Sequence, residues 1–250
     1  MKKAWLVLPL LIFSCNGQNP NPADSTPPTV YPGALGSNNE IAQAFDDKTA
    51  SKAVESWHLM RNPDETIKRI ETFPVPNSPI LCMAICDYEP LWWGFFGLYE
   101  LKEGYISWQA DCDNPPDENS IRNLHAHALT GFIAPIVEVY GMTHMGNGNL
   151  YLYELQNRKL VLLLKTRAVD DHWGDGSIFR DGRLLPEYTD LNGDGVTELV
   201  LKGEIEEREE KGNQLVSSRP CQKVFLWNKD RHQFEEDLSR RIGFEDKNDL

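Results

Sequence analysis

One short segment of the chain carries oxygen-bearing side chains at even spacing. Residues 190–199 read DLNGDGVTEL. Hard cations such as calcium bind six to eight oxygens, and a tight loop can supply several of them by directing alternate side chains inward. The positions that would supply oxygens here, with Val196 using its carbonyl, are Asp190, Asn192, Asp194, Val196 and Glu198. Gly193 and Gly195 allow the sharp backbone course that such a loop needs.

This segment resembles two families of calcium loop. In the EF-hand, oxygen ligands stand at positions one, three and five, glycine at six and a glutamate at twelve, where this chain has Leu201. The loop of integrin-type (FG-GAP, VCBS-like) repeats is similar over residues 183–207, since its ninth position is acidic and a strand follows. The resemblance implies one structural Ca²⁺ bound by the five positions named above. A solvated Asn/Gly/Asp turn without metal is the alternative.

Cysteines and histidines suggest weaker sites. The beginning of the chain, described below, indicates export, and in an exported protein an even number of cysteines favours disulfides, here among Cys82, Cys86, Cys112 and Cys221, with buried thiols as the alternative. Export oxidises thiols, so we rank a zinc site below both. His125 and His127 would share one face of a strand and suit zinc or copper, with His144 approaching from elsewhere, but a third ligand at a recognisable spacing is missing.

No catalytic motif stands out in the sequence. Gly-x-Ser-x-Gly, a phosphate-binding glycine loop and HExxH are all absent. Acidic residues are abundant enough to form a glycosidase pair, but abundance alone gives no specificity. The aromatic segment at 90–96 (PLWWGFF) is interpreted as core, with a sugar- or protein-binding surface as the alternative.

The chain begins like an exported protein. Lys2 and Lys3 precede the apolar residues 4–13, a run too short to cross a bilayer as a helix. The next residues, Ile12-Phe13-Ser14-Cys15, resemble a bacterial lipobox. The resemblance implies removal of residues 1–14, a signal peptide, and lipid attachment at Cys15, so that the protein is held on a membrane.

Composition and this anchor define the expected location and partners. Removal of residues 1–14 takes away two lysines and changes the net charge from −13 to −15, which argues against nucleic acid as a partner. We expect a lipid-anchored protein of the cell envelope, in the outer membrane facing the periplasm or on the cell surface if the cell has two membranes. Its expected partners are the membrane and an envelope protein or glycan.

The elements that would position these residues are mainly strands. Residues 15–39 are rich in Pro, Asn, Gly and Ser, and they predict a flexible tether. Residues 40–77 predict a helical segment, with a second helix beginning at Asn62-Pro63. Residues 78–250 alternate apolar runs with turns, which predicts an antiparallel hairpin meander. The expected fold is therefore mainly β with a short N-terminal helical segment, and α+β is the alternative.

The function that these features favour is non-enzymatic. A surface tether, a calcium loop and the lack of a catalytic motif are typical of an envelope binding or scaffold protein. An envelope hydrolase acting on glycans or peptides, and a periplasmic enzyme inhibitor, are the alternatives.

Overall fold

The computed structural model describes one compact unit of the chain. The described residues are 46–89, 94–117, 120–143, 147–170, 172–173, 178–209 and 211–243, all within the unit Gly36–Leu250. The signal peptide, Cys15, the tether and residues 40–45 of the expected helical segment lie outside these residues, as does His144. Among the described helices, none has the length and apolarity needed to span a membrane.

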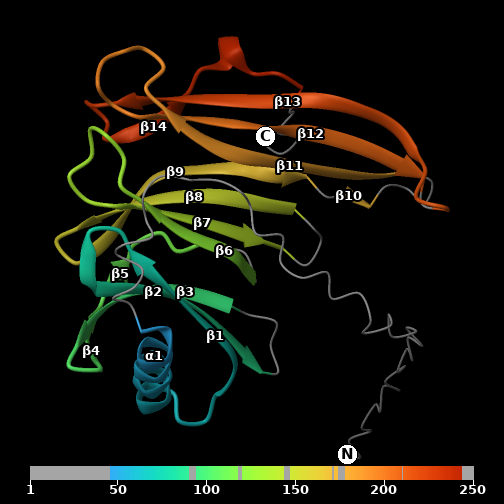
Figure 1. Ribbon diagram of the computed structural model, residues 1–250. Helices are drawn as coiled ribbons and strands as arrows, with labels where there is room; N and C mark the ends of the chain where they lie inside the picture. Colours follow the sequence, from blue (N-terminus) through green and yellow to red (C-terminus); the bar gives the residue numbers. More distant parts are fainter. Residues whose placement is uncertain are drawn as a thin grey trace, which may run out of the picture. The chain divides into compact units, whose positions relative to one another are not determined.

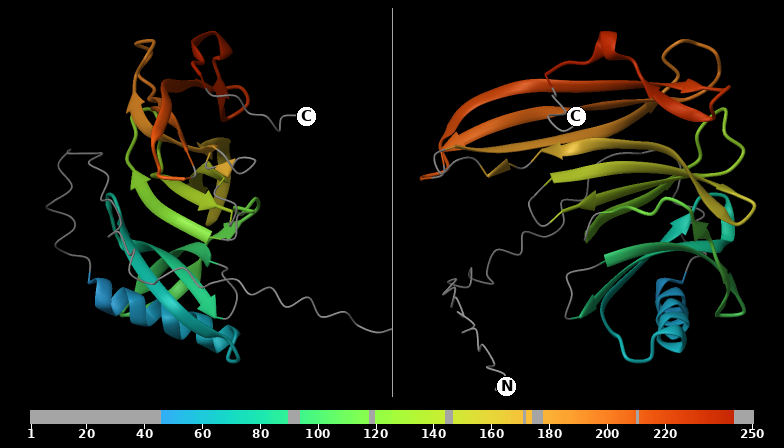
Figure 2. Two further views of the ribbon diagram at one scale, coloured as in Figure 1. Left: turned by 90° about the vertical axis from the view of Figure 1, so that its right-hand side faces the viewer. Right: turned by 180° about the vertical axis from the view of Figure 1, so that it is seen from behind.

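A four-stranded antiparallel meander carries the only α-helix of the described residues. The strands pair in chain order and are β1 (Thr66–Val75), β2 (Ser78–Glu89), β3 (Gly94–Lys102) and β4 (Tyr105–Gln109). Helix α1 (Asp47–Arg61) begins at the N-cap Asp46, whose carboxylate accepts hydrogen bonds from the N–H groups of Lys48 and Thr49. Figures 1 and 2 show α1 lying against this sheet.

A larger sheet follows along the chain. Its strands are β5 (Asp111–Cys112), β6 (Ser120–His127), β7 (Ile136–Met142), β8 (Asn147–Gln156), β9 (Lys159–Asp170), β10 (His172–Trp173), β11 (Ile178–Thr189), β12 (Glu198–Glu209), β13 (Leu215–Asn228) and β14 (Gln233–Glu236). The order of the strands is β14-β13-β12-β11-β9-β8-β7-β6. Of the two short strands outside this order, β10 pairs with β11 and β5 pairs with β9. A 3₁₀ turn, η2 (Leu238–Arg240), follows β14. Strand β14 also contacts β9, so the sheet curls back towards its own middle strands.

Alternation along the strands divides the core into three clusters. In β2, Cys82, Ala84 and Cys86 pack under α1, whereas Met83 and Ile85 face the larger sheet. Strand β8 of the larger sheet is covered on both faces in the same way. Its Leu150 and Leu152 enter a cluster on the inner side of the curl, whereas Tyr151 and Tyr153 meet the smaller sheet. Both faces of residues 150–154 are therefore buried.

The expected fold class is confirmed. The described part is mainly β, with antiparallel hairpins and one helix near its beginning. Two hairpin connections have the backbone geometry that tight turns require: φ is positive at Glu103 and Gly104, and again at Asn157 and Arg158.

The prediction of a second helix beginning at Asn62 is wrong, and so is the prediction that the helical segment extends to residue 77. Asn62 ends α1 instead, and its N–H donates to the carbonyl of His58. Residues 66–75 then form β1, which pairs with β2 over most of its length. The β-branched residues Thr66, Ile67 and Ile70 favour a strand once a partner is available, and this pairing outweighs the local helix-start pattern.

The four described cysteines are free thiols. Cys82, Cys86 and Cys221 are buried and Cys112 is half-buried. The expected disulfides among these four are therefore absent, and the structure agrees with the alternative of buried thiols. Burial raises the pKa of the Cys82 thiol to about 12, and burial together with the Asp87 charge does the same for Cys86. These thiols stay protonated and fill space as small apolar groups.

Candidate metal centre

The strands β11 and β12 hold the predicted cation loop at their shared end. Thr189 pairs with Glu198, so the segment 190–197 is the connection of one hairpin. Gly193 and Gly195 have φ of 75° and 81°, and a Cβ built on either would meet no atom within 4 Å. Backbone conformation, and not crowding, therefore favours glycine at both positions.

Backbone N–H groups hold the acidic side chains of this loop. The Asp190 carboxylate accepts from Gly193 at 2.7 Å and from Gly195 at 2.9 Å. Asp194 accepts from the N–H of Val196 at 2.9 Å, and Glu198 accepts from Leu191 at 2.6 Å. An oxygen that accepts one hydrogen bond keeps a second lone pair, so these carboxylates can still bind a cation.

Three of the five predicted ligand residues converge. Asp190, Asp194 and Glu198 each place a carboxylate oxygen within 4.8 Å of the others, and they are the only such group of acidic, histidine or cysteine ligands among the described residues. The other two predicted positions are held differently. Asn192 accepts the Asp194 N–H at 2.9 Å and donates from its amide to Glu198 at 3.1 Å. Val196 is buried, with its N–H bound to Asp194.

The charges of the three carboxylates are unevenly compensated. Hydrogen bonds from backbone N–H groups, first that of Gly195, lower the pKa of Asp190. Glu198 is only 1% exposed, and this burial raises its pKa, with the negative charges of Asp194 and Asp190 adding to the effect. A cation among the three would remove this repulsion, and its ligands would all be the hard oxygens that suit group-two ions.

The surroundings of the loop come from distant parts of the chain. The Thr197 N–H donates to the carbonyl of Thr130 at 2.9 Å, and Val196 packs so closely on Gly131 that a Cβ there would lie 2.9–3.0 Å from it. Lys229, in the turn between β13 and β14, places its ammonium 3.8 Å from Asp194. Sequence reasoning missed these neighbours because no local spacing connects them to the loop.

The histidine pair lies on the larger sheet near the same hairpin. His127 binds the carboxylate of Glu138 at 2.9 Å, and the Tyr188 hydroxyl donates to that carboxylate at 2.6 Å. Glu138 is buried, so these two partners compensate its desolvation. The His125 ring lies 6.2 Å from that of His127, centre to centre. Neither histidine joins a group of three ligands in the described chain.

The aromatic segment at 90–96 is described only at its end. Phe95 and Phe96 pack in the core clusters under α1 and between the sheets, as the core interpretation predicts for them. Residues 90–93, with both tryptophans, lie outside the described residues.

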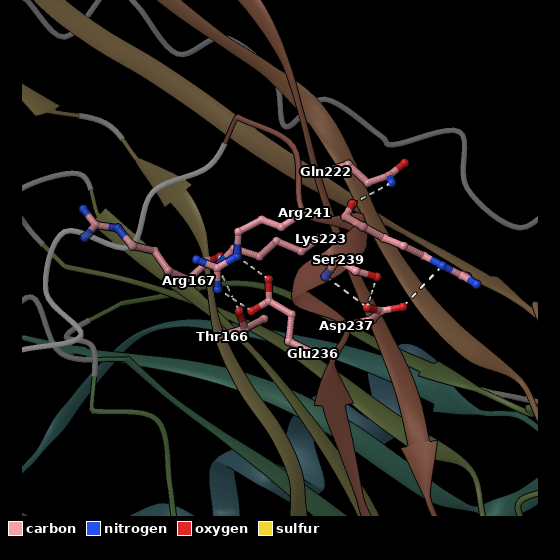
Figure 3. Close-up of polar contacts among 9 residues, drawn as sticks. Thr166, Arg167, Gln222, Lys223, Glu236, Asp237, Ser239 and Arg241 are labelled. Carbon is pink, nitrogen blue, oxygen red and sulfur yellow. Dashed lines mark hydrogen bonds and ion pairs between the residues drawn. The ribbon is translucent and has the colours of Figure 1, made fainter.

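A second polar cluster, drawn in Figure 3, holds strands of the larger sheet together. The fully buried Lys223 of β13 donates to the Thr166 hydroxyl at 3.2 Å and to the Arg167 carbonyl at 3.1 Å, both on β9. Beside it, Arg241 forms a two-pronged ion pair with Glu236. The Lys223 contacts join β13 to β9 across the inner face of the curled sheet, and the Arg241 pair joins the residues after β14 to the end of that strand.

Comparisons with known proteins add no family to this description. No family model matches the chain, and no curated protein matches it in sequence.

Proposed function

We propose that this chain is a lipid-anchored protein of the cell envelope whose β body binds one structural Ca²⁺ in the β11–β12 loop and serves as a non-enzymatic binding scaffold. The observation that carries the proposal is the convergence of Asp190, Asp194 and Glu198 in a loop shaped by two glycines with positive φ. Asn192 and the carbonyl of Val196 would complete the protein ligands.

The chemistry of this donor set favours calcium over softer metals. All of its atoms are oxygens, and exposure of the Asp190 and Asp194 side leaves room for water ligands. The bound ion would fix the loop against Thr130 and Gly131, and thereby the connection from β6 to β7. Because the loop already has its hydrogen bonds, its expected role is to stabilise this end of the sheet and not to fold it.

Thermal unfolding of the purified protein tests the calcium site. We expect the midpoint to fall in EDTA and to rise in millimolar calcium, because an ion bound only to the native state adds about 2.7 kcal/mol at a hundredfold excess over its dissociation constant. Asp194→Ala should abolish the rise. Asp64→Ala, which removes an exposed carboxylate elsewhere, should keep it. An equal rise with magnesium would refute the assignment to calcium, and no rise with either ion would refute the site.

The lipid anchor has its own test. Cells that express the protein are labelled with a palmitate analogue, and Cys15→Ala should abolish the label in the protein. Equal labelling of both forms would refute anchoring through Cys15.

A further inference from the structure

A groove with a different chemistry lies between α1 and the β3–β4 hairpin. Its volume is about 560 Å³, within the range of small-ligand sites. Helix α1 contributes Trp57 and Arg61 to the lining, and the end of β4 contributes Trp108 and Gln109. Asp111, of β5, also lines the groove. The groove thus presents flat aromatic rings beside planar hydrogen-bonding groups.

The first aromatic ring is held in place before any ligand binds. The Trp57 Nε1–H donates to the Gln109 side-chain carbonyl at 3.0 Å. The Arg61 guanidinium lies 3.3 Å from the centre of the Trp57 ring and donates one hydrogen bond to the Trp57 carbonyl at 3.2 Å. A guanidinium has five N–H donors, so the stacked and exposed Arg61 retains donors for a ligand. Fixed side chains lose less entropy when a ligand binds.

A second aromatic ring, that of Trp108 in β4, lines the groove beside the first. Trp108 is half-buried, and the guanidinium of Arg158, in the β8–β9 turn, lies 5.2 Å from its ring centre. Arg158 stands outside the residues that line the groove, so Arg61 is the guanidinium that a ligand would meet there. The Asp111 carboxylate lines the same groove, so its two charged groups have opposite signs and can bind different parts of one ligand.

The chemistry of the lining fits a sugar better than a hydrocarbon chain. The negative π face of an indole attracts the polarised C–H groups of a pyranose ring, and the Gln109 amide and Asp111 carboxylate can bind hydroxyl groups. An arginine fork binds a carboxylate through two parallel hydrogen bonds. We propose that this groove binds an oligosaccharide that carries carboxylate groups, with Arg61 as the carboxylate ligand. This inference rests on the proposed function, because a protein of the cell envelope would meet such glycans.

Titration of the full-length protein with tetragalacturonate tests the proposal, with the indole N–H signals in NMR as the readout and chitotetraose as the uncharged oligosaccharide. We expect saturable changes at Trp57 and Trp108, and binding of the uncharged oligomer at least about tenfold weaker, as is typical for loss of a charge-assisted hydrogen bond. Arg61→Gln should remove the difference, and Arg61→Lys should restore it only in part. Arg231→Gln, at an exposed arginine elsewhere, is the matched control.

Three results would overturn the proposal. They are no change at either indole with millimolar oligosaccharide, an acid preference that persists in Arg61→Gln, and equal changes with an acidic peptide of the same charge. The calcium response of unfolding, measured on the same samples, separates the two ideas. If calcium stabilises the protein and no oligosaccharide binds, the glycan inference fails while the calcium scaffold stands.

Discussion

The buried His58 predicts a loss of stability in mild acid. Its imidazole lies between α1 and the smaller sheet, 6% exposed, with Nε2 2.7 Å from the Tyr99 hydroxyl and Nδ1 3.1 Å from the Tyr88 hydroxyl. The Phe95 ring is 4.5 Å away, centre to centre. Burial, and then the positive charge of Arg61, lower the pKa of His58 from 6.5 to about 4.

The sign of the effect follows from the two states. Between pH 6.5 and about 4 the unfolded chain binds a proton at residue 58 and the native protein does not, so acid favours unfolding. The stability is complete above pH 6.5 and is lost as the pH falls towards 4. Since one pKa unit corresponds to about 1.4 kcal/mol, the loss from this residue should be about 3 kcal/mol. Tyr88 and Tyr99 do not oppose it, because burial raises the pKa of both hydroxyls and they stay neutral.

Urea unfolding at several pH values between 7.5 and 4.5 measures this loss. The comparison is between the wild type and His58→Gln, which cannot be protonated. The variant should be less stable at pH 7.5 but should lose less stability in acid, and the difference between the two curves isolates residue 58 from the carboxylates. Met60→Gln, at a residue that is 73% exposed on the same helix, should follow the wild type. A His58 pKa near 6.5 by NMR, or parallel curves for His58→Gln and wild type, would refute the reasoning.

Three further predictions concern single positions. Gly195→Ala should lower the free energy of unfolding, measured in urea, by about 1 kcal/mol, because alanine is strained at its positive φ but its Cβ meets no other atom. Gly131→Ala should lower it more, because the added Cβ also overlaps Val196. Equal losses for the two variants would contradict this difference. Lys223→Ala should lose roughly 2–4 kcal/mol in the same assay, whereas Lys223→Met, of similar volume, should lose far less; equal losses would show that the ammonium contacts dominate. In native protein at pH 8, peptide mapping after iodoacetamide should show Cys112 modified well before the other described cysteines, because they are buried; disulfide-linked peptides would overturn the free-thiol assignment.

The sequence was informative where one strand or one loop contains its own pattern. Strand β2 contains one of the apolar runs from which the hairpin meander was predicted, and the structure buries Cys82, Ala84 and Cys86 on one face and Met83 and Ile85 on the other. The loop residues Asp190, Asp194 and Glu198 were found in the same way, because their spacing alone brings them together.

Prediction failed where a local signal has two meanings or where distant segments meet. Asn62-Pro63 suits a helix start, yet Asn62 closes α1, because the pairing of β1 with β2 decides the state of the residues that follow. The contacts of the cation loop with Thr130 and Lys229 depend on which strands become neighbours in the larger sheet. That order is fixed by packing across the whole core and leaves no trace in local spacing.

The hydrogen bonds of the cation loop determine what an ion can change there. Asp190 is already satisfied by two backbone N–H groups, so the loop has its turn without metal. Glu198 is the costly member, since it is buried beside two other acids at the first position of β12. Lys229 compensates poorly, because its ammonium is 3.8 Å from Asp194 and both side chains are exposed. A divalent ion would act mainly on this repulsion, and its effect would pass through Thr197 to Thr130. Calcium should therefore tighten the connection between β6 and β7 and leave the smaller sheet unchanged, which keeps the proposed glycan groove independent of the ion.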